Sequence, residues 1–191
     1  MPVTAAPLVH FPTGFRSVFS SSRPLRQLLA GQSALLGDAA RLAAGGDLRD
    51  HHRNAAANHR QSLLALRTAL VTPFDSEDIA DLLGGIARTV NCLNQVAGDP
   101  DDTLLPLARE WALLLAGIIP TLPETRLVDR SLAELRRLDR AFRLAEREAF
   151  TLPLEPLEAV RRQAVRERYQ ALRSSLRDLT FQARRVRYRN G

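Results

Sequence analysis

The chain has one cysteine, no lysine, and few residues that favour β-strands. The single cysteine, Cys92, excludes an internal disulfide and a cluster of thiolate metal ligands. Valine and isoleucine together supply 14 of the 191 residues, whereas leucine, alanine and arginine supply 87. Strand-forming residues are therefore scarce and helix-forming residues abundant, so an all-α fold is expected.

The sequence has no apolar run as long as a typical membrane span. Its longest run, residues 111–119, has nine residues between Glu110 and Pro120, about half of the ~20 that a bilayer requires. The first twenty residues have no basic residue before Arg16 and no continuous apolar stretch, unlike a secretory signal. These absences predict a cytoplasmic protein that reaches a membrane only through a partner.

Catalytic and cofactor motifs are also missing. We find no phosphate-binding P-loop, no dinucleotide-binding glycine fingerprint and no serine nucleophile elbow, so neither enzymatic activity nor a cofactor is expected. Of the four histidines (His10, His51, His52 and His59), His52 and His59 share one predicted helix face about 10 Å apart. That separation is too large for a shared ion, so hydrogen-bonded or edge positions are expected.

Helical periodicity begins at residue 22. Residues 1–21 carry three prolines and no sustained period, and we expect them to form a flexible N-terminal arm. In residues 22–191, apolar residues recur every three or four positions, and glycine or proline pairs interrupt the pattern. In the third helix the predicted buried stripe consists of Ile79, Leu82, Ile86, Val90, Leu93 and Ala97. The predicted helices cover about residues 23–44, 47–72, 75–97, 101–119, 124–150 and 157–189. The expected fold is an all-α antiparallel bundle of five or six helices.

The last predicted helix has the clearest apolar stripe, at alternating steps of four and three residues. This seam consists of Val165, Tyr169, Leu172, Leu176, Leu179, Ala183 and Val186. It extends over three heptads, which predicts a bundle interface of the coiled-coil type and makes a homodimer plausible.

A conspicuous motif joins the second and third predicted helices. Its residues are Thr72, Pro73, Asp75, Glu77, Asp78 and Ile79. Capping rules explain the motif without any ligand: Pro73 ends one helix, Asp75 caps the next, and Asp78 stands where it would nearly complete a capping box.

The segment around this motif, residues 66–83, reads LRTALVTPFDSEDIADLL and resembles the helix junction of the PhoU-like proteins that accompany low-affinity Pit phosphate transporters. The pair Asp139 and Arg140 also fits that family. The resemblance implies a PhoU-like bundle, a non-catalytic accessory or regulatory role, and a Pit-type membrane phosphate transporter as partner.

Family members bind metal ions through helix carboxylates, and the resemblance implies where these would fall. Most of the positions are not acidic here, since they hold Asn54, Ala56, Ala87, Arg88, Asn91, Asn94, Arg173 and Arg177. Asp139 alone is retained. One carboxylate with amides is a poor site for a hard cation, so we predict a divergent member with degenerate metal sites.

Arginine at former acidic positions suggests the opposite ligand charge. Guanidinium groups could hold an anion such as phosphate, or a partner's carboxylate. The candidate contacts are Arg88, Arg173, Arg177, Arg184 and Arg185. The alternative is that these side chains lay their stems on the bundle margin and extend their charged ends into water.

The basic C-terminal helix supports a second function. From Arg161 onward the chain has ten arginines and two acids, Glu167 and Asp178, a pattern that suits nucleic-acid or lipid phosphates. Stacking on bases requires exposed aromatics, and only Tyr169, Phe181 and Tyr188 are near. Nucleic-acid binding is therefore the alternative to the accessory role.

Overall fold

The computed structural model describes residues 23–45, 48, 53, 57–64, 75–97, 103–122, 128–151 and 156–190. In this part of the chain the protein is an all-α bundle without strands, as the composition predicts. Its helices are α2 (Arg23–Leu42), α4 (Ser76–Val96), α5 (Leu104–Ile118), the 3-10 helix η1 (Ile119–Thr121), α6 (Val128–Ala149) and α7 (Pro156–Asn190). Residues 57–64 are helical too. The predicted arm and the residues Asn54, Ala56, Thr72 and Pro73 lie outside the described residues.

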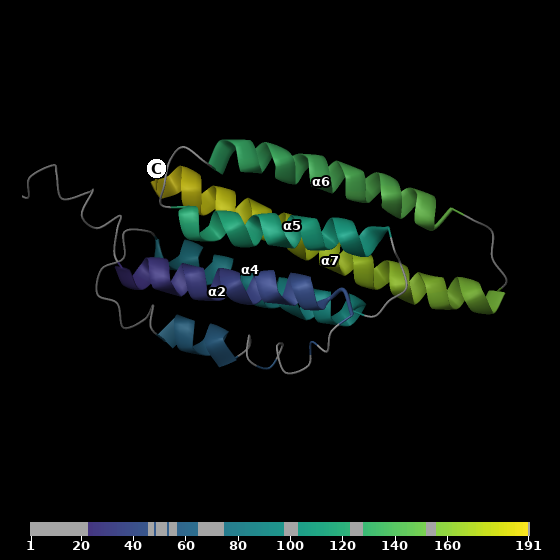
Figure 1. Ribbon diagram of the computed structural model, residues 1–191, viewed down its shortest axis with the longest axis horizontal. Helices are drawn as coiled ribbons and strands as arrows, with labels where there is room; N and C mark the ends of the chain where they lie inside the picture. Colours follow the sequence, from purple (N-terminus) through teal and green to yellow (C-terminus); the bar gives the residue numbers. More distant parts are fainter. Residues whose placement is uncertain are drawn as a thin grey trace, which may run out of the picture.

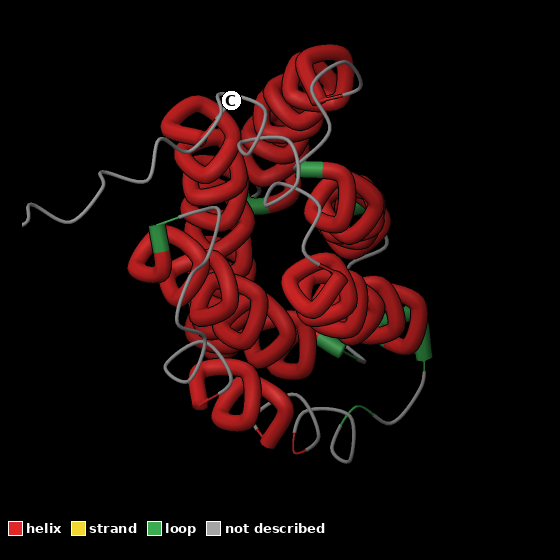
Figure 2. Tube along the Cα trace, turned by 90° about the vertical axis from the view of Figure 1, so that its left-hand side faces the viewer, coloured by secondary structure: helices red, strands yellow, loops and turns green. Residues whose placement is uncertain are grey.

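The long helices run side by side along the longest axis of the molecule (Figure 1) and are seen nearly end-on in Figure 2. Three contacts show that α4 and α7 are antiparallel, because residues later in α4 contact residues earlier in α7. Asp78 contacts Arg185, Thr89 contacts Ser175, and the carbonyl of Gln95 accepts from Arg168, at 2.7, 2.8 and 3.3 Å.

The predicted seam of α7 forms the interface with α4. Six of its seven residues are fully buried, from Tyr169 to Val186, and Val165 packs at the edge of the core. They meet the predicted apolar stripe of α4, in which Ile79, Leu82, Ile86, Val90 and Leu93 are buried. The seam prediction is therefore confirmed, and α7, with 35 residues, serves as the spine of the bundle.

A glycine allows α7 to approach α4 closely. A methyl group at Gly85 of α4 would overlap the side-chain amide of Gln182 and lie 3.1 Å from Leu179 Cδ1, both on α7. A side chain at this position would therefore force the Gln182 side chain to move.

The start of α4 agrees with the sequence prediction in one respect and differs in another. Asp75 is the N-cap, since its Oδ1 accepts a hydrogen bond from the Glu77 backbone N–H at 2.9 Å. Asp78, in contrast, is buried and pairs across the bundle with Arg185. The expectation that Asp78 completes a capping box is wrong, because its carboxylate turns toward α7.

One segment, Leu104–Thr121, is long and apolar enough by length and composition to cross a membrane. This segment is longer than the nine-residue apolar run found in the sequence, because Arg109 and Glu110 lie within the segment and end that run. In the bundle, α5 packs against α2, α6 and α7. Its apolar composition therefore matches its position between three other helices, although residues such as Glu110 remain exposed.

The seam predicts a large difference between two leucines of α7. Leu176 is fully buried in the interface with α4, whereas Leu157 is 68% exposed near the start of the same helix. Replacing Leu176 with alanine should lower the free energy of unfolding by about 2–5 kcal/mol through lost burial and a cavity. The matched Leu157→Ala should change it by no more than about 0.5 kcal/mol. Urea unfolding followed by circular dichroism measures both, and equal losses would contradict the interface.

Candidate functional site: an arginine-lined pocket

The position of a residue relative to the buried seam of α7 decides which neighbouring helices it faces, and the candidate site lies on one side of this seam. Residues one position before a seam residue face α4, as the contacts of Arg168, Ser175 and Arg185 show. Residues one position after a seam residue face the opposite side. On that side Gln170, Arg173 and Thr180 contact α6 and α5. Neighbouring residues of α7 therefore belong to different environments.

On the α4 side, Arg185 is committed to an internal ion pair. Its Nε lies 2.7 Å from Oδ1 of Asp78, whose side chain is fully buried, and its Nη1 lies 3.5 Å from Asp81 Oδ2. A buried carboxylate needs such a partner, because an isolated charge is strongly disfavoured inside a protein. The candidate role of Arg185 in binding an external anion is therefore not supported.

On the α6 side, Arg173 is likewise engaged within the bundle. Its Nε donates to Asp139 Oδ1 at 3.0 Å, and its Nη1 lies 3.8 Å from Glu146 Oε2. Glu146 is buried and also accepts from Gln170 Nε2 at 2.8 Å. Asp139 thus pairs with Arg173, and both residues stand where the PhoU-like resemblance predicts metal ligands.

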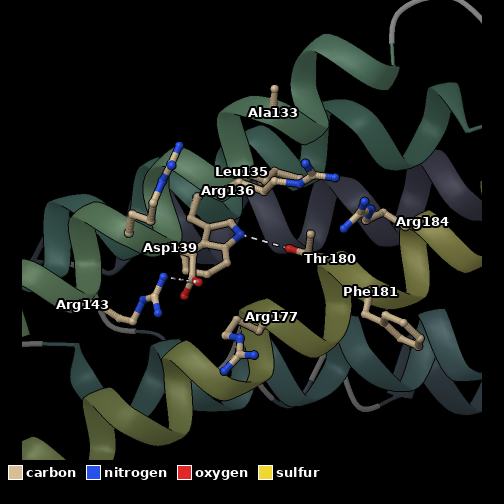
Figure 3. A pocket seen from close by; sticks show the side chains of 11 residues that line it. Ala133, Leu135, Arg136, Asp139, Arg143, Arg177, Thr180, Phe181 and Arg184 are labelled. Carbon is tan, nitrogen blue, oxygen red and sulfur yellow. Dashed lines mark hydrogen bonds and ion pairs between the residues drawn. The ribbon is translucent and has the colours of Figure 1, made fainter.

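Next to this network, a pocket of about 560 Å³ opens between α6 and α7, with α5 at its base. Figure 3 shows Arg136 of α6 and Arg184 of α7 pointing into the same space. The lining residues are Trp111, Ala133, Leu135, Arg136, Asp139, Arg140, Arg143, Arg177, Thr180, Phe181 and Arg184. Trp111 is held in place by a hydrogen bond of 3.1 Å from its Nε1 to Thr180 Oγ1 (Figure 3).

The pocket has a strong excess of positive charge. Five arginines and one aspartate line it, and that aspartate is already paired with Arg173 at 3.0 Å and with Arg143 at 3.7 Å. The other four lining arginines form no ion pair with any residue that the structure describes; they are Arg136, Arg140, Arg177 and Arg184. Chemically, this arrangement suits an anion with several oxygen atoms, since guanidinium groups bind such oxygens through paired N–H donors.

The structure brings only two of the five predicted anion contacts together. Arg177 and Arg184 line the pocket, while Arg173 and Arg185 are used in ion pairs. Arg88 is exposed on α4, away from the pocket lining. Of the three arginines at predicted ligand positions, Arg88, Arg173 and Arg177, only Arg177 lines the pocket.

The other residues of α4 at which the resemblance predicts ligands carry no acidic group. Ala87, Asn91 and Asn94 are partly buried. Within the described ranges, no group of three or more histidine, cysteine, aspartate or glutamate side chains is arranged to hold a metal ion. The described residues thus offer no carboxylate cluster at the positions where the family has one.

The arginines of α6 were missed by the sequence analysis. Arg136, Arg140, Arg143 and Arg147 follow steps of four, three and four residues, which places them on one helix face. From that spacing a basic face on this helix could have been predicted.

No protein-family model matches the chain, and no curated protein is significantly similar to it in sequence. The class is therefore defined by the structure alone: an all-α helical bundle with an arginine-lined pocket on one side of its longest helix.

Two adjacent arginines provide a test of the division of α7. Arg185→Met should lower the free energy of unfolding by roughly 2–4 kcal/mol, because Asp78 then loses its partner; the value lies below that of a fully buried pair because Arg185 is 30% exposed. Arg184→Met should cost less than about 0.5 kcal/mol, since its charge has no partner among the described residues. Thermal and urea unfolding of both variants measure the difference, and a larger loss in Arg184→Met would contradict this assignment.

His59 gives a second test of the electrostatics, on the α4 side of the bundle. Burial and, to a smaller extent, the charge of Arg88 hold the pKa of His59 below its ordinary value of 6.5. The unfolded chain therefore binds the proton more readily, so the stability that the neutral ring contributes above pH 6.5 is lost as the pH falls below 6.5 and through the lowered pKa of the folded state. A titration of the His59 ring by NMR should show the lowered pKa, and Arg88→Gln should move it upward. A pKa unchanged in the variant would exclude the contribution of Arg88.

Proposed function

We propose that the protein is a non-catalytic binding protein whose pocket holds a multiply charged, phosphate-bearing anion. The observation that carries the proposal is that five arginines line one pocket whose only carboxylate is already paired. Like charges repel when they are held close together, and an anion that bridges them relieves this repulsion and satisfies their N–H donors.

The biological setting that we propose is an accessory or regulatory partner of a Pit-type membrane phosphate transporter. It rests on the resemblance of residues 66–83 to the PhoU-like helix junction. A regulator of phosphate uptake needs a site that responds to phosphate compounds but no catalytic group. The arginine-lined pocket supports such a site, and we propose that the protein catalyses no reaction.

Anion binding is tested by thermal unfolding with sodium tripolyphosphate against sodium chloride at equal ionic strength. At 100 times its Kd, a ligand stabilises the folded state by about 2.7 kcal/mol, which raises the Tm of a chain of this size by about 5–10 °C. The double variant Arg177→Gln/Arg184→Gln should lose most of this shift.

The matched control for that experiment is Arg60→Gln/Arg161→Gln. It removes the same charge from two exposed arginines that do not line the pocket, and it should keep the full shift. No shift in the unaltered protein, or an equal loss in both double variants, would overturn the anion site.

The transporter setting requires a separate experiment. Crosslinking in native cells, followed by recovery of the protein and mass spectrometry, should identify a phosphate permease. Recovery of ribosomal or nucleoid proteins without a permease would overturn this setting, whatever the pocket binds.

One observation favours nucleic-acid binding as a second candidate. A smaller pocket lined by Arg140, Arg143, Leu144 and Arg147 continues the basic surface along α6. A bound nucleic-acid backbone would release counterions, so its affinity should fall steeply with salt. Weak salt dependence in filter binding to single-stranded RNA would exclude this candidate.

A further inference from the structure

We infer that the ligand of the arginine-lined pocket carries a planar ring beside its phosphate groups, as a nucleotide does. The inference rests on the anion site proposed above and deepens it by naming the class of ligand.

The size and lining of the pocket favour an organic anion. A volume of about 560 Å³ lies within the range of about 300–1,000 Å³ that is typical of sites for organic ligands, and it is far more than one phosphate group fills. The lining also includes apolar residues: Trp111 and Leu135, which are buried, and Ala133 and Phe181, which are exposed. An inorganic anion has no use for the exposed apolar surface of Phe181, whereas a ring system would cover it.

Phe181 offers a surface on which a ring can stack. It lines the pocket from α7 and is 66% exposed, so its ring is accessible to a ligand. Arg177 and Arg184 are four residues before it and three residues after it, so the three side chains occupy one face of the helix. Phosphate-binding groups thus alternate with an aromatic group, the arrangement by which proteins hold a base and its phosphates together.

The phosphate end of the ligand has its own partners. Arg136 and Arg184 point from facing helices into the same space (Figure 3), so a chain of phosphates placed between them can accept from both. Arginine also stacks its planar group on bases. The polar half and the apolar half of a nucleotide therefore each meet suitable residues.

The experiment compares ATP with tripolyphosphate by isothermal titration calorimetry in metal-free buffer. Both ligands carry three linked phosphates, so the difference in affinity reports the adenosine group. ATP should bind the full-length protein at least fivefold more tightly. Replacing Phe181 with leucine should reduce the affinity for ATP by roughly 5- to 100-fold and leave that for tripolyphosphate unchanged.

Tyr188→Leu is the matched control, because Tyr188 is a 65% exposed aromatic residue on the same helix that does not line the pocket. This variant should bind ATP as the unaltered protein does. Trp111, the single tryptophan of the chain, lies in the pocket wall, so its fluorescence should respond to tripolyphosphate and ATP alike.

The outcomes separate this inference from the function on which it rests. Equal affinities for ATP and tripolyphosphate, or an ATP affinity insensitive to Phe181→Leu, overturn ring recognition and leave the anion site intact. Binding of neither ligand overturns both. A six-nucleotide strand of oligoadenylate that binds at least tenfold more tightly than ATP, with the same loss in Phe181→Leu, upholds ring and phosphate recognition and identifies a strand, not a free nucleotide, as the source.

Discussion

The antiparallel packing of α7 on α4 is the constraint on which the other features of this protein depend. The six fully buried residues of the seam, from Tyr169 to Val186, fix the rotation of α7 about its own axis, because turning the helix would bring the adjacent polar residues into the interface. With the rotation fixed, every other residue of α7 has a determined direction. Arg185 then meets Asp78 on one side, and Arg184 meets the pocket on the other.

Charge is therefore distributed unevenly around one helix. Where acids are available, the arginines of α7 are neutralised: Arg173 by Asp139 and Glu146, and Arg185 by Asp78 and Asp81. Asp139 is the one carboxylate among the residues that line the pocket, where arginines of α6 face those of α7. Water screens such charges while the pocket is open, so the fold tolerates an excess that a multivalent anion can use.

The proposed relationship to PhoU-like proteins gives this distribution a simple history. At two positions where the proposed relationship predicts acids, this chain has Arg173 and Arg177. Arg173 pairs with Asp139, and Arg177 lines the pocket. An exchange of acidic for basic residues on one helix face would convert a surface suited to cations into one suited to anions, without changes in the buried seam.

The local pattern of the chain was enough to predict the helical class, the seam of α7, the apolar stripe of α4 and the cap at Asp75. Each depends on the spacing of residues within one helix, and the helical period of 3.6 residues is the same wherever that helix lies. The partners of Asp78, Arg173 and Arg185 could not be predicted in this way, because they lie 107, 34 and 107 positions away along the chain. The packing of α6 and α4 on opposite sides of α7 decided which arginines are neutralised and which line a pocket. An ion pair needs its atoms within about 4 Å, and the spacing of residues along one helix does not indicate which helix lies opposite.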